Sequence, residues 1–167
     1  IAFMGEHGGS GFAVPENNLI NATLAALGSA MSIQNANVQD GGSQIALRAN
    51  GEILTHDLTA GVDAYHYAAF APILGAPEIL MYGHNLTSVM MGFENIGAGS
   101  IFLITDQNVF DSGRLNAGDN RRMFENLLLA DTGAPPPPPQ CGQPGQPPCP
   151  TPIPIPSTIP LIGLGLA

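Results

Sequence analysis

The sequence predicts an α/β domain with a mostly parallel sheet, followed by an extended Pro-rich tail. A short apolar run at residues 1–4 (IAFM) is ended by a Gly-rich turn, and residues 15–28 then carry apolar side chains at helical spacing. A second apolar run at residues 101–104 (IFLI) is typical of a strand buried on both faces. Beyond Gly133 the composition turns to Pro, which excludes a hydrophobic core there.

The elements follow from these patterns in chain order. Residues 1–4 predict a strand buried on both faces, and residues 15–28 a helix that ends at a glycine. Residues 31–33 predict a strand parallel to the first, reached by a right-handed crossover. Residues 40–61 predict short strands or an irregular loop, because turn residues interrupt them. Further strands are predicted at residues 64–70, 78–82, 88–93 and 99–105, and a last helix at residues 119–129.

Three segments divide the chain. Residues 1–131 are expected to form the domain, and residues 132–160 a Pro-rich linker of polyproline-II type. Cys141 and Cys149 both lie in this linker, which favours a disulfide in an oxidising compartment. Residues 161–167 begin an apolar segment that is much shorter than the roughly 20 residues of a membrane span.

The charge of the chain limits its partners. It has four Arg, no Lys and thirteen acidic residues, a net charge of −9. Such a surface repels nucleic acid and anionic membranes, so neither is expected as a partner. Charged residues are only 10% of the chain, against about 25% in ordinary soluble domains. This low charge suits a surface that packs against other copies, although a monomeric exported protein has the same composition.

The domain resembles the class I glutamine amidotransferase-like superfamily, in its branch of flavodoxin-like domains from exported bacterial proteins. The resemblance is carried by residues 3–7 (FMGEH), 17–28, 53–62 (ILTHDLTAGV) and 97–106, with Asn120 and Asn126 downstream. It implies a flavodoxin-like, three-layer fold. Active members of the superfamily place a Cys at a tight turn beside a His and a carboxylate.

The tail resembles a PEP-CTERM sorting signal. Residues 154–167 contain Pro-x-Pro-Ser-Thr followed by a Gly- and Leu-rich span, although Ile155 stands where the family has Glu and the terminal basic cluster is missing. The resemblance implies export from a Gram-negative-type bacterium to its surface or the extracellular space. It also implies an exosortase-like processing enzyme as a partner.

The Gly-rich turn after residue 4 is the candidate for chemistry. It carries Glu6, His7 and Ser10, but residues 1–131 contain no Cys, which excludes cysteine-based amide hydrolysis in this chain. Ser10 is preceded by two glycines but lacks the second Gly of a serine nucleophile elbow. In the alternative interpretation, the glycines only allow a tight turn, and Glu6 and His7 satisfy backbone groups.

Polar residues at strand ends predict a ligand-binding edge. The carboxyl ends of parallel strands are where doubly wound folds bind ligands. A hydrolase using this edge would rely on Glu6 and His7, with His56 or Asp106 to orient them. A glycan- or cation-binding module at the same edge is a further alternative. The ligand-binding candidates are Glu6, His7, Ser10, Asp106 and Asn108.

A metal site is the weaker alternative for the segment after residue 105. Asp106, Asn108 and Asp111 bring oxygen ligands together in one turn, which suits calcium, but their spacing is not that of an EF-hand. Helix capping by Asp106 and Asp119 explains the same residues. The four histidines lack the i, i+4 pairing of zinc sites. No other cofactor is predicted.

The leading hypothesis is a non-catalytic surface or extracellular-matrix protein that assembles with itself through its domain and its Pro-rich tail. The expected assembly is a homo-oligomer, with a filament as one form of it. Extracellular polysaccharide is a candidate partner. The alternative hypothesis is a hydrolase or a carbohydrate-processing or carbohydrate-binding domain that uses the Glu6 and His7 turn.

Overall fold

The structure is a computed structural model that describes residues 1–131 except 36, 85 and 112. The predicted linker, the Cys141–Cys149 disulfide and the sorting segment lie outside the described residues. The described helices and strands are β1 (Ala2–Met4), α1 (Val14–Leu27), β2 (Ser32–Ile33), β3 (Gln44–Leu47), β4 (Ala64–Tyr67), β5 (Ile73–Leu74), β6 (Glu78–Gly83), β7 (Ser88–Ile96), β8 (Gly99–Ile104) and α2 (Asn120–Asp131).

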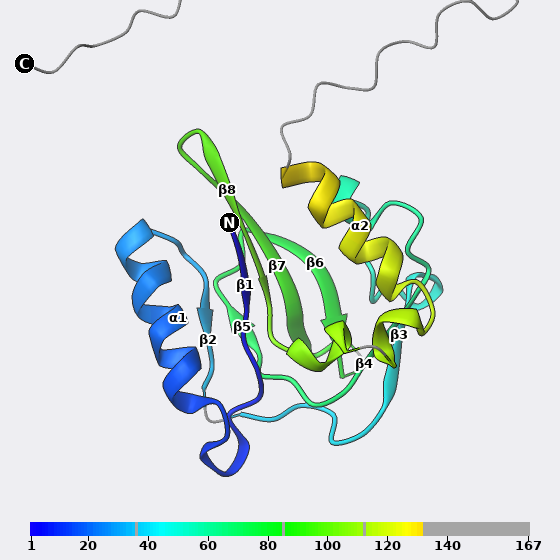
Figure 1. Ribbon diagram of the computed structural model, residues 1–167, viewed down its shortest axis with the longest axis horizontal. Coiled ribbons are helices and arrows are strands. Elements are labelled where there is room, and N and C mark those ends of the chain that lie inside the picture. Colours follow the sequence, from blue (N-terminus) through cyan, green and yellow to red (C-terminus); the bar gives the residue numbers. More distant parts are fainter. Residues whose placement is uncertain (36, 85, 112, 132–167) are drawn as a thin grey trace, which may run out of the picture. The chain divides into compact units, whose positions relative to one another are not determined.

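A mixed sheet of four strands forms the centre of the domain, in the order β1-β8-β7-β6 (Figure 1). β1 is parallel to β8, whereas β8 pairs with β7 and β7 with β6 in antiparallel orientation. The predicted mostly parallel, flavodoxin-like three-layer fold is therefore wrong. The connections explain the difference: only Gly97 and Ala98 separate β7 from β8, and a parallel connection needs about a dozen residues.

The predicted crossover from β1 to residues 31–33 is also wrong. β2 does not join the central sheet but pairs antiparallel with β5, where Ser32 lies opposite Leu74. β3 and β4 form another antiparallel pair. These two small ribbons raise the proportion of antiparallel strands, so the domain is a mixed α/β fold with two α-helices among the described residues.

α1 begins and ends as its sequence predicts. Pro15 lies in its first turn, where the missing backbone N–H costs nothing. Gly28 ends the helix in the left-handed conformation (φ 79°), and its N–H bonds to the carbonyl groups of Leu24 and Ala25. Leu24 is fully buried, and it fixes the face of the helix that packs on the domain.

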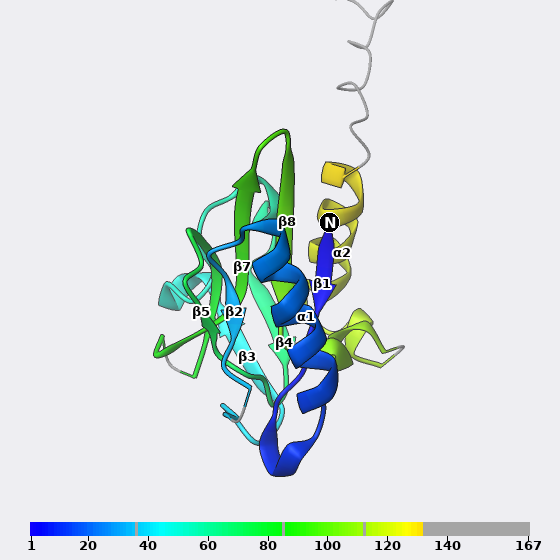
Figure 2. The ribbon, with the colours of Figure 1, turned by 90° about the vertical axis from the view of Figure 1, so that its left-hand side faces the viewer.

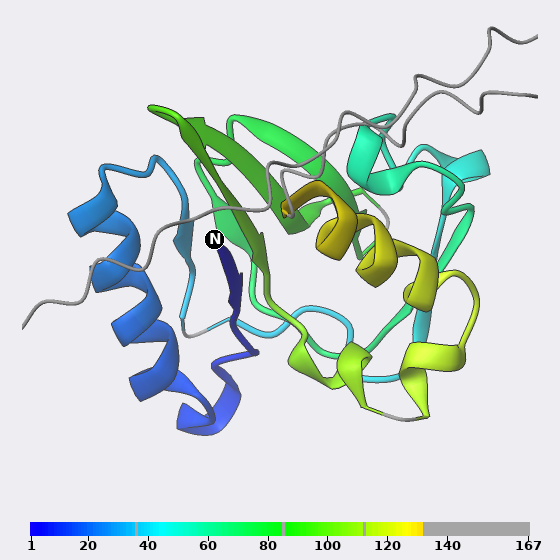
Figure 3. The same cartoon turned by 45° about the horizontal axis from the view of Figure 1, so that its top comes forward.

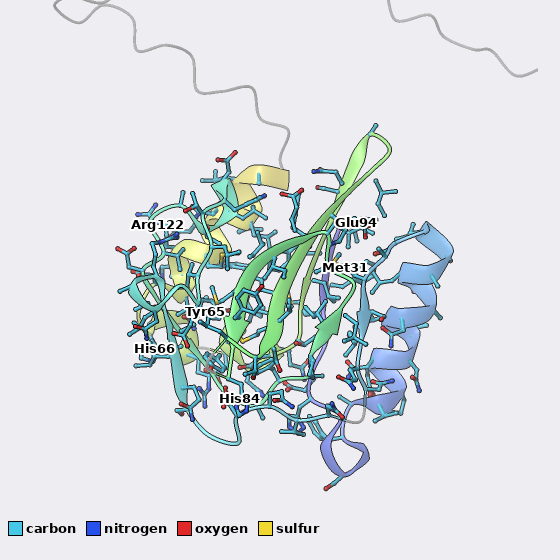
Figure 4. All side chains as sticks on the ribbon, turned by 180° about the vertical axis from the view of Figure 1, so that it is seen from behind. Met31, Tyr65, His66, His84, Glu94 and Arg122 are labelled. Carbon is cyan, nitrogen blue, oxygen red and sulfur yellow. The ribbon has the colours of Figure 1, made fainter. Side chains whose placement is uncertain are left out.

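The two helices lie on opposite sides of the central sheet (Figure 3). β8 shows why, because its successive side chains alternate between two apolar clusters. Ile101 and Leu103 pack with Leu24 of α1, whereas Phe102 and Ile104 pack in the cluster that includes Met123 of α2. Figure 4 shows Met31 and Glu94 on the side of α1, with Tyr65 and His66 on the side of α2.

β7 contains a bulge opposite β6. The register shifts on both sides of Met81, first at Leu80 of β6 and then at Met90 of β7. Because of the second shift, the neighbouring residues Met90 and Met91 pack in the same cluster. The bulge thus directs two large side chains toward the side of α2.

Just beyond β8, the hydroxyl of Thr105 donates to the Ala71 carbonyl at 2.5 Å.

β1 is an edge strand of the central sheet, and it is less buried than its apolar sequence predicts. Ala2 and Met4 are exposed and Phe3 is half-buried, so the prediction of burial on both faces is wrong. Ile1, just before the strand, is 60% exposed. The strand has a partner on only one side, which leaves its other edge without one in the described sheet.

Candidate functional site

The carboxyl ends of β1 and β8 meet because these two strands are parallel. Gly5, directly after β1, donates its N–H to the carbonyl of Ile104 at 2.8 Å. Glu6 follows, and Asn17 of α1 holds its backbone from both sides. The Glu6 N–H donates to Asn17 Oδ1 (3.1 Å), and Asn17 Nδ2 donates to the Glu6 carbonyl (2.6 Å). The first turn of the chain is therefore fastened to the first helix.

The carboxylate of Glu6 is buried, with only 1% of the residue exposed. Its Oε1 accepts from the backbone N–H of His7 (2.8 Å), and its Oε2 accepts from Nδ2 of Asn108 (2.9 Å). Burial raises the pKa of Glu6 to about 7, and the nearby Asp106 adds to the rise, while backbone hydrogen bonds oppose it. Near neutral pH the group therefore exists in both protonation states.

Asp106 is fully buried at the end of β8. Its Oδ1 accepts from the N–H of Asn108 (3.1 Å), and its Oδ2 accepts from the N–H of Ala68 (2.5 Å). Burial raises the pKa of Asp106, and these two hydrogen bonds oppose that rise. The carboxylate thus caps the 3-10 helix at Gln107–Phe110 and ties it to the segment after β4.

His7 and Ser10 lie in the loop between β1 and α1. The His7 ring stacks on Phe12, with centroids 4.9 Å apart and planes inclined by 23°. His7 Nδ1 is buried without a hydrogen-bond partner among the described residues. Ser10 is exposed and has φ 55°, in the left-handed region.

A cavity of about 190 Å³ opens beside this loop. The structure thus brings Glu6, Asp106 and Asn108 together through direct hydrogen bonds, with His7 adjacent to Glu6. The cavity is lined by Met4, Gly5, Glu6, Phe12, Ala13, Glu16, Asn17 and Gln107.

His56 does not join this cluster. Its Nδ1 accepts from the N–H of Leu58 at 3.0 Å, its Nε2 lies 3.5 Å from Oε2 of Glu78, and its ring contacts Phe93. It begins the 3-10 helix at Asp57–Thr59 in a capping arrangement. A hydrolase mechanism with His56 orienting Glu6 and His7 therefore has no geometric basis in this structure.

The other histidines are equally separate. His84 Nδ1 lies 2.7 Å from Oδ1 of Asp40, whose Oδ2 accepts from the hydroxyl of Tyr67 at 2.7 Å. His66 lies in β4, and Asn120, at the start of α2, donates from Nδ2 to its carbonyl at 2.7 Å. This Tyr67–Asp40–His84 cluster ties the β6–β7 turn to the loop before β3.

The calcium candidates have separate partners. Asp111 Oδ1 accepts from the N–H groups of Gly113 and Arg114, both at 2.8 Å, whereas Asn108 bonds to Glu6. Within the described part of the chain, no group of three or more His, Cys, Asp or Glu could hold a metal ion. Asp119, the other expected cap, accepts from the N–H groups of Asp63 and Ala64 and so ties β4 to the start of α2.

A second hollow, which we call the α2 groove, lies on the other side of β1. It has a volume of about 530 Å³, and residues of both β1 and α2 line it. Figure 2 shows these two elements side by side. The analysis of the sequence missed this groove, although Phe124, Leu127 and Leu128 recur at helical spacing and therefore form an apolar side of α2. The groove is lined by Ile1, Ala2, Met4, His56, Asp57, Leu58, Phe93, Asn95, Ser100, Phe102, Phe124, Leu127, Leu128 and Ala130.

The fold defines a class of protein, a mixed α/β domain in which an antiparallel β6–β7–β8 meander carries one parallel edge strand. The chain is similar to a solved structure described as the mmIFT52 N-terminal domain, with a TM-score of 0.60 and 14% sequence identity. The match covers 78% of this chain and 63% of that one, so the chain spans less than two thirds of its neighbour. At this identity the likeness shows the fold alone.

No family model and no curated protein matches the chain. The expected resemblance to amidotransferase-like domains is thus corrected by the structural neighbour and by the mixed, mostly antiparallel strands. The PEP-CTERM resemblance likewise finds no support. Neither helix in the described part of the chain is long and apolar enough to cross a membrane.

Proposed function

We propose that this domain is a non-catalytic assembly domain of an exported protein, and that two copies of it associate through β1 and the α2 groove. The observation that carries the proposal is the apolar edge strand β1, in which Ala2 and Met4 are exposed and Phe3 is half-buried. Exposed apolar edge strands readily pair with further strands. The low content of charged residues favours the same conclusion, and Cys141 and Cys149, which favour an oxidising compartment, support export.

The backbone of β1 supports pairing on its outer edge. The carbonyl of Ile1 and the N–H of Gly5 both bond to β8. Backbone groups alternate in direction along a strand, so those of Ala2 and Met4 face away from β8. These groups can bond to a second strand without disturbing the existing pair.

The α2 groove supplies the apolar area that a three-residue strand lacks. A stable interface buries roughly 800 Å² on each partner, which is more than β1 alone offers. Leu128 is 52% exposed beside the groove and Ile1 is 60% exposed, so both add apolar surface next to the strand.

Charge permits a second copy of the chain as the occupant of the α2 groove. The chain carries −9, which makes two copies repel each other over most of their surface. Asp57 is the only acidic side chain among the residues that line the α2 groove. Antiparallel pairing of β1 with its own copy is self-complementary, as a two-fold interface requires.

Light scattering coupled to size exclusion tests the proposal on the full chain. We expect a dimer for the wild type and a monomer for Leu128→Glu, because a charge then enters the apolar groove. Leu19→Glu is the matched control, since Leu19 is 70% exposed on α1 and does not line the groove. A wild type that stays monomeric up to high concentration, or equal behaviour of the two variants, contradicts the proposal.

Ala2→Pro separates strand pairing from groove contact. Its missing N–H is one that faces away from β8, so the fold loses no bond within the sheet. We expect this variant to dissociate while keeping the circular dichroism spectrum of the wild type. A dimer as stable as that of the wild type would exclude pairing through β1.

A further inference from the structure

We propose that the cavity of about 190 Å³ at the carboxyl end of β1 binds one neutral sugar ring. The inference does not depend on the proposed assembly, because the two sites have different walls. Met4 alone lines both the cavity and the α2 groove. A ligand pocket of this kind combines apolar walls with a few convergent polar groups.

The polar wall of the cavity offers both donors and acceptors. Glu6, Glu16, Asn17 and Gln107 line the cavity. Glu16 and Gln107 are exposed, whereas Glu6 and Asn17 are buried in its wall. The Glu6 carboxylate accepts from the His7 N–H and from Asn108 Nδ2, and a backbone hydrogen bond from Gln107 also lowers its pKa. A carboxylate has about four acceptor positions, so capacity remains for a ligand. Asn17 Nδ2 uses one of its two N–H groups on the Glu6 carbonyl. Hydroxyl groups, which donate and accept, match this mixture.

The apolar wall is an aromatic ring held in place. Phe12 is 53% exposed, and the His7 ring stacks on it with the ring centroids 4.9 Å apart. An aromatic face is electron-rich and attracts the positively polarised C–H groups of a saturated ring. A sugar ring presents such C–H groups on one face and hydroxyl groups at its rim.

The loop that carries Phe12 adopts a costly backbone. Ser10 (φ 55°) and Ala13 (φ 52°) flank it, and both lie in the left-handed region without being glycine. Ala13 also stands at the N-cap of α1, where it provides no side-chain acceptor for the first turn. Replacing Ala13 by a capping residue would be simple, so the present sequence is consistent with a loop shaped to form the cavity.

Charge selects a neutral ligand. Two acidic residues, Glu6 and Glu16, line the cavity, and Asp106 lies close enough to raise the pKa of Glu6. An anionic ligand such as a uronic acid is repelled by this wall and by the net charge of the chain. A metal ion lacks a set of three acidic or imidazole ligands in the described residues.

Saturation-transfer NMR on the full chain tests the inference with glucose, galactose and mannose as probes and glucuronate as the anionic counterpart. We expect transfer to at least one neutral sugar and a weaker signal for glucuronate. Phe12→Ala should weaken binding about tenfold, the usual size of one aromatic contact. Glu16→Gln should reduce the difference in saturation-transfer signal between glucose and glucuronate.

Leu19→Ala is the matched control, because Leu19 is an exposed apolar residue of α1 outside the cavity. The Leu128→Glu variant should bind the sugar as the wild type does, so the two proposals can fail separately. The inference is overturned if none of the neutral sugars shows transfer at millimolar concentration. It is also overturned if Phe12→Ala and Leu19→Ala give equal signals while both keep the wild-type circular dichroism spectrum.

Discussion

Residues 1–4 (IAFM) and residues 101–104 (IFLI) are almost equally apolar, and they lie side by side as the parallel pair β1 and β8. β8 has strands on both sides and clusters on both faces, so Ile101 to Ile104 are all buried. β1 has one neighbour and leaves Ile1 60% exposed. Local composition thus predicts a strand, but its place in the sheet decides how much of it is buried.

The largest expected loss of stability distinguishes a substitution in β8 from one beside β1. Leu103→Ala removes a fully buried side chain from β8 and should lower the free energy of unfolding by about 3–4 kcal/mol, because it leaves a cavity. Ile1→Ala, beside β1, should cost less than about 1 kcal/mol in the dissociated protein. Urea unfolding at low protein concentration measures both values. Equal losses would mean that β1 is as buried as β8.

The next largest loss of stability is expected at the carboxyl end of the β1–β8 pair, where Asp106 lies. Asp106→Ala leaves the N–H groups of Ala68 and Asn108 without their acceptor in a partly buried place. We expect the free energy of unfolding to fall by about 2–3 kcal/mol. Asp111→Ala is the control, because that exposed carboxylate also accepts two N–H groups but water can replace it. A similar loss in both variants would show that burial is not the cause.

A pH effect should follow from Glu6. Its pKa of about 7 lies above the usual value of about 4.5, so between these pH values the folded state holds more protons than the unfolded state. Stability therefore falls as pH rises from 5 to 8, by on the order of 2 kcal/mol. Glu6→Gln cannot titrate and should lose this slope, as thermal or urea unfolding across the range would reveal. An unchanged slope in that variant contradicts the assignment.

The smallest effect should come from Asp40, and it has the opposite sign. Burial opposes ionisation of Asp40, but hydrogen bonds from His84 and Tyr67 outweigh it and lower the pKa. The ionised group thus stabilises the fold above about pH 4, and this stabilisation is lost as pH falls through the lowered pKa. Asp40→Asn should cost about 1 kcal/mol at pH 7 and nothing near pH 2. A constant difference across that range would exclude a role for ionisation.

The sequence predicted elements better than it predicted their directions. The helix at residues 15–28 and the strands at 78–82, 88–93 and 99–105 agree with α1, β6, β7 and β8 within a few residues. The prediction of a mostly parallel sheet was wrong because an apolar run predicts a strand but not whether that strand is parallel or antiparallel to its neighbour. The two residues between β7 and β8 did hold the information, since so short a connection permits only a hairpin.

The candidate site, too, was predicted in part. Glu6, Asp106 and Asn108 could be placed together because each directly follows or closely follows an apolar run, and their strands do lie in parallel. His56 could not be excluded beforehand, because its partner Glu78 begins a strand far along the chain. The α2 groove was missed because it depends on β1 lying at the edge, which only the complete sheet determines.

The pairing of Ala2 with Phe102 has a consequence for the order of folding. The β6–β7–β8 meander closes through short turns, so it can form early at little cost in chain entropy. β1 must instead find β8 across almost the whole domain, which makes its docking a late step. We therefore expect a folding transition state with a formed meander and an undocked first strand, in which substitutions in β8 slow folding and those in β1 mainly speed unfolding.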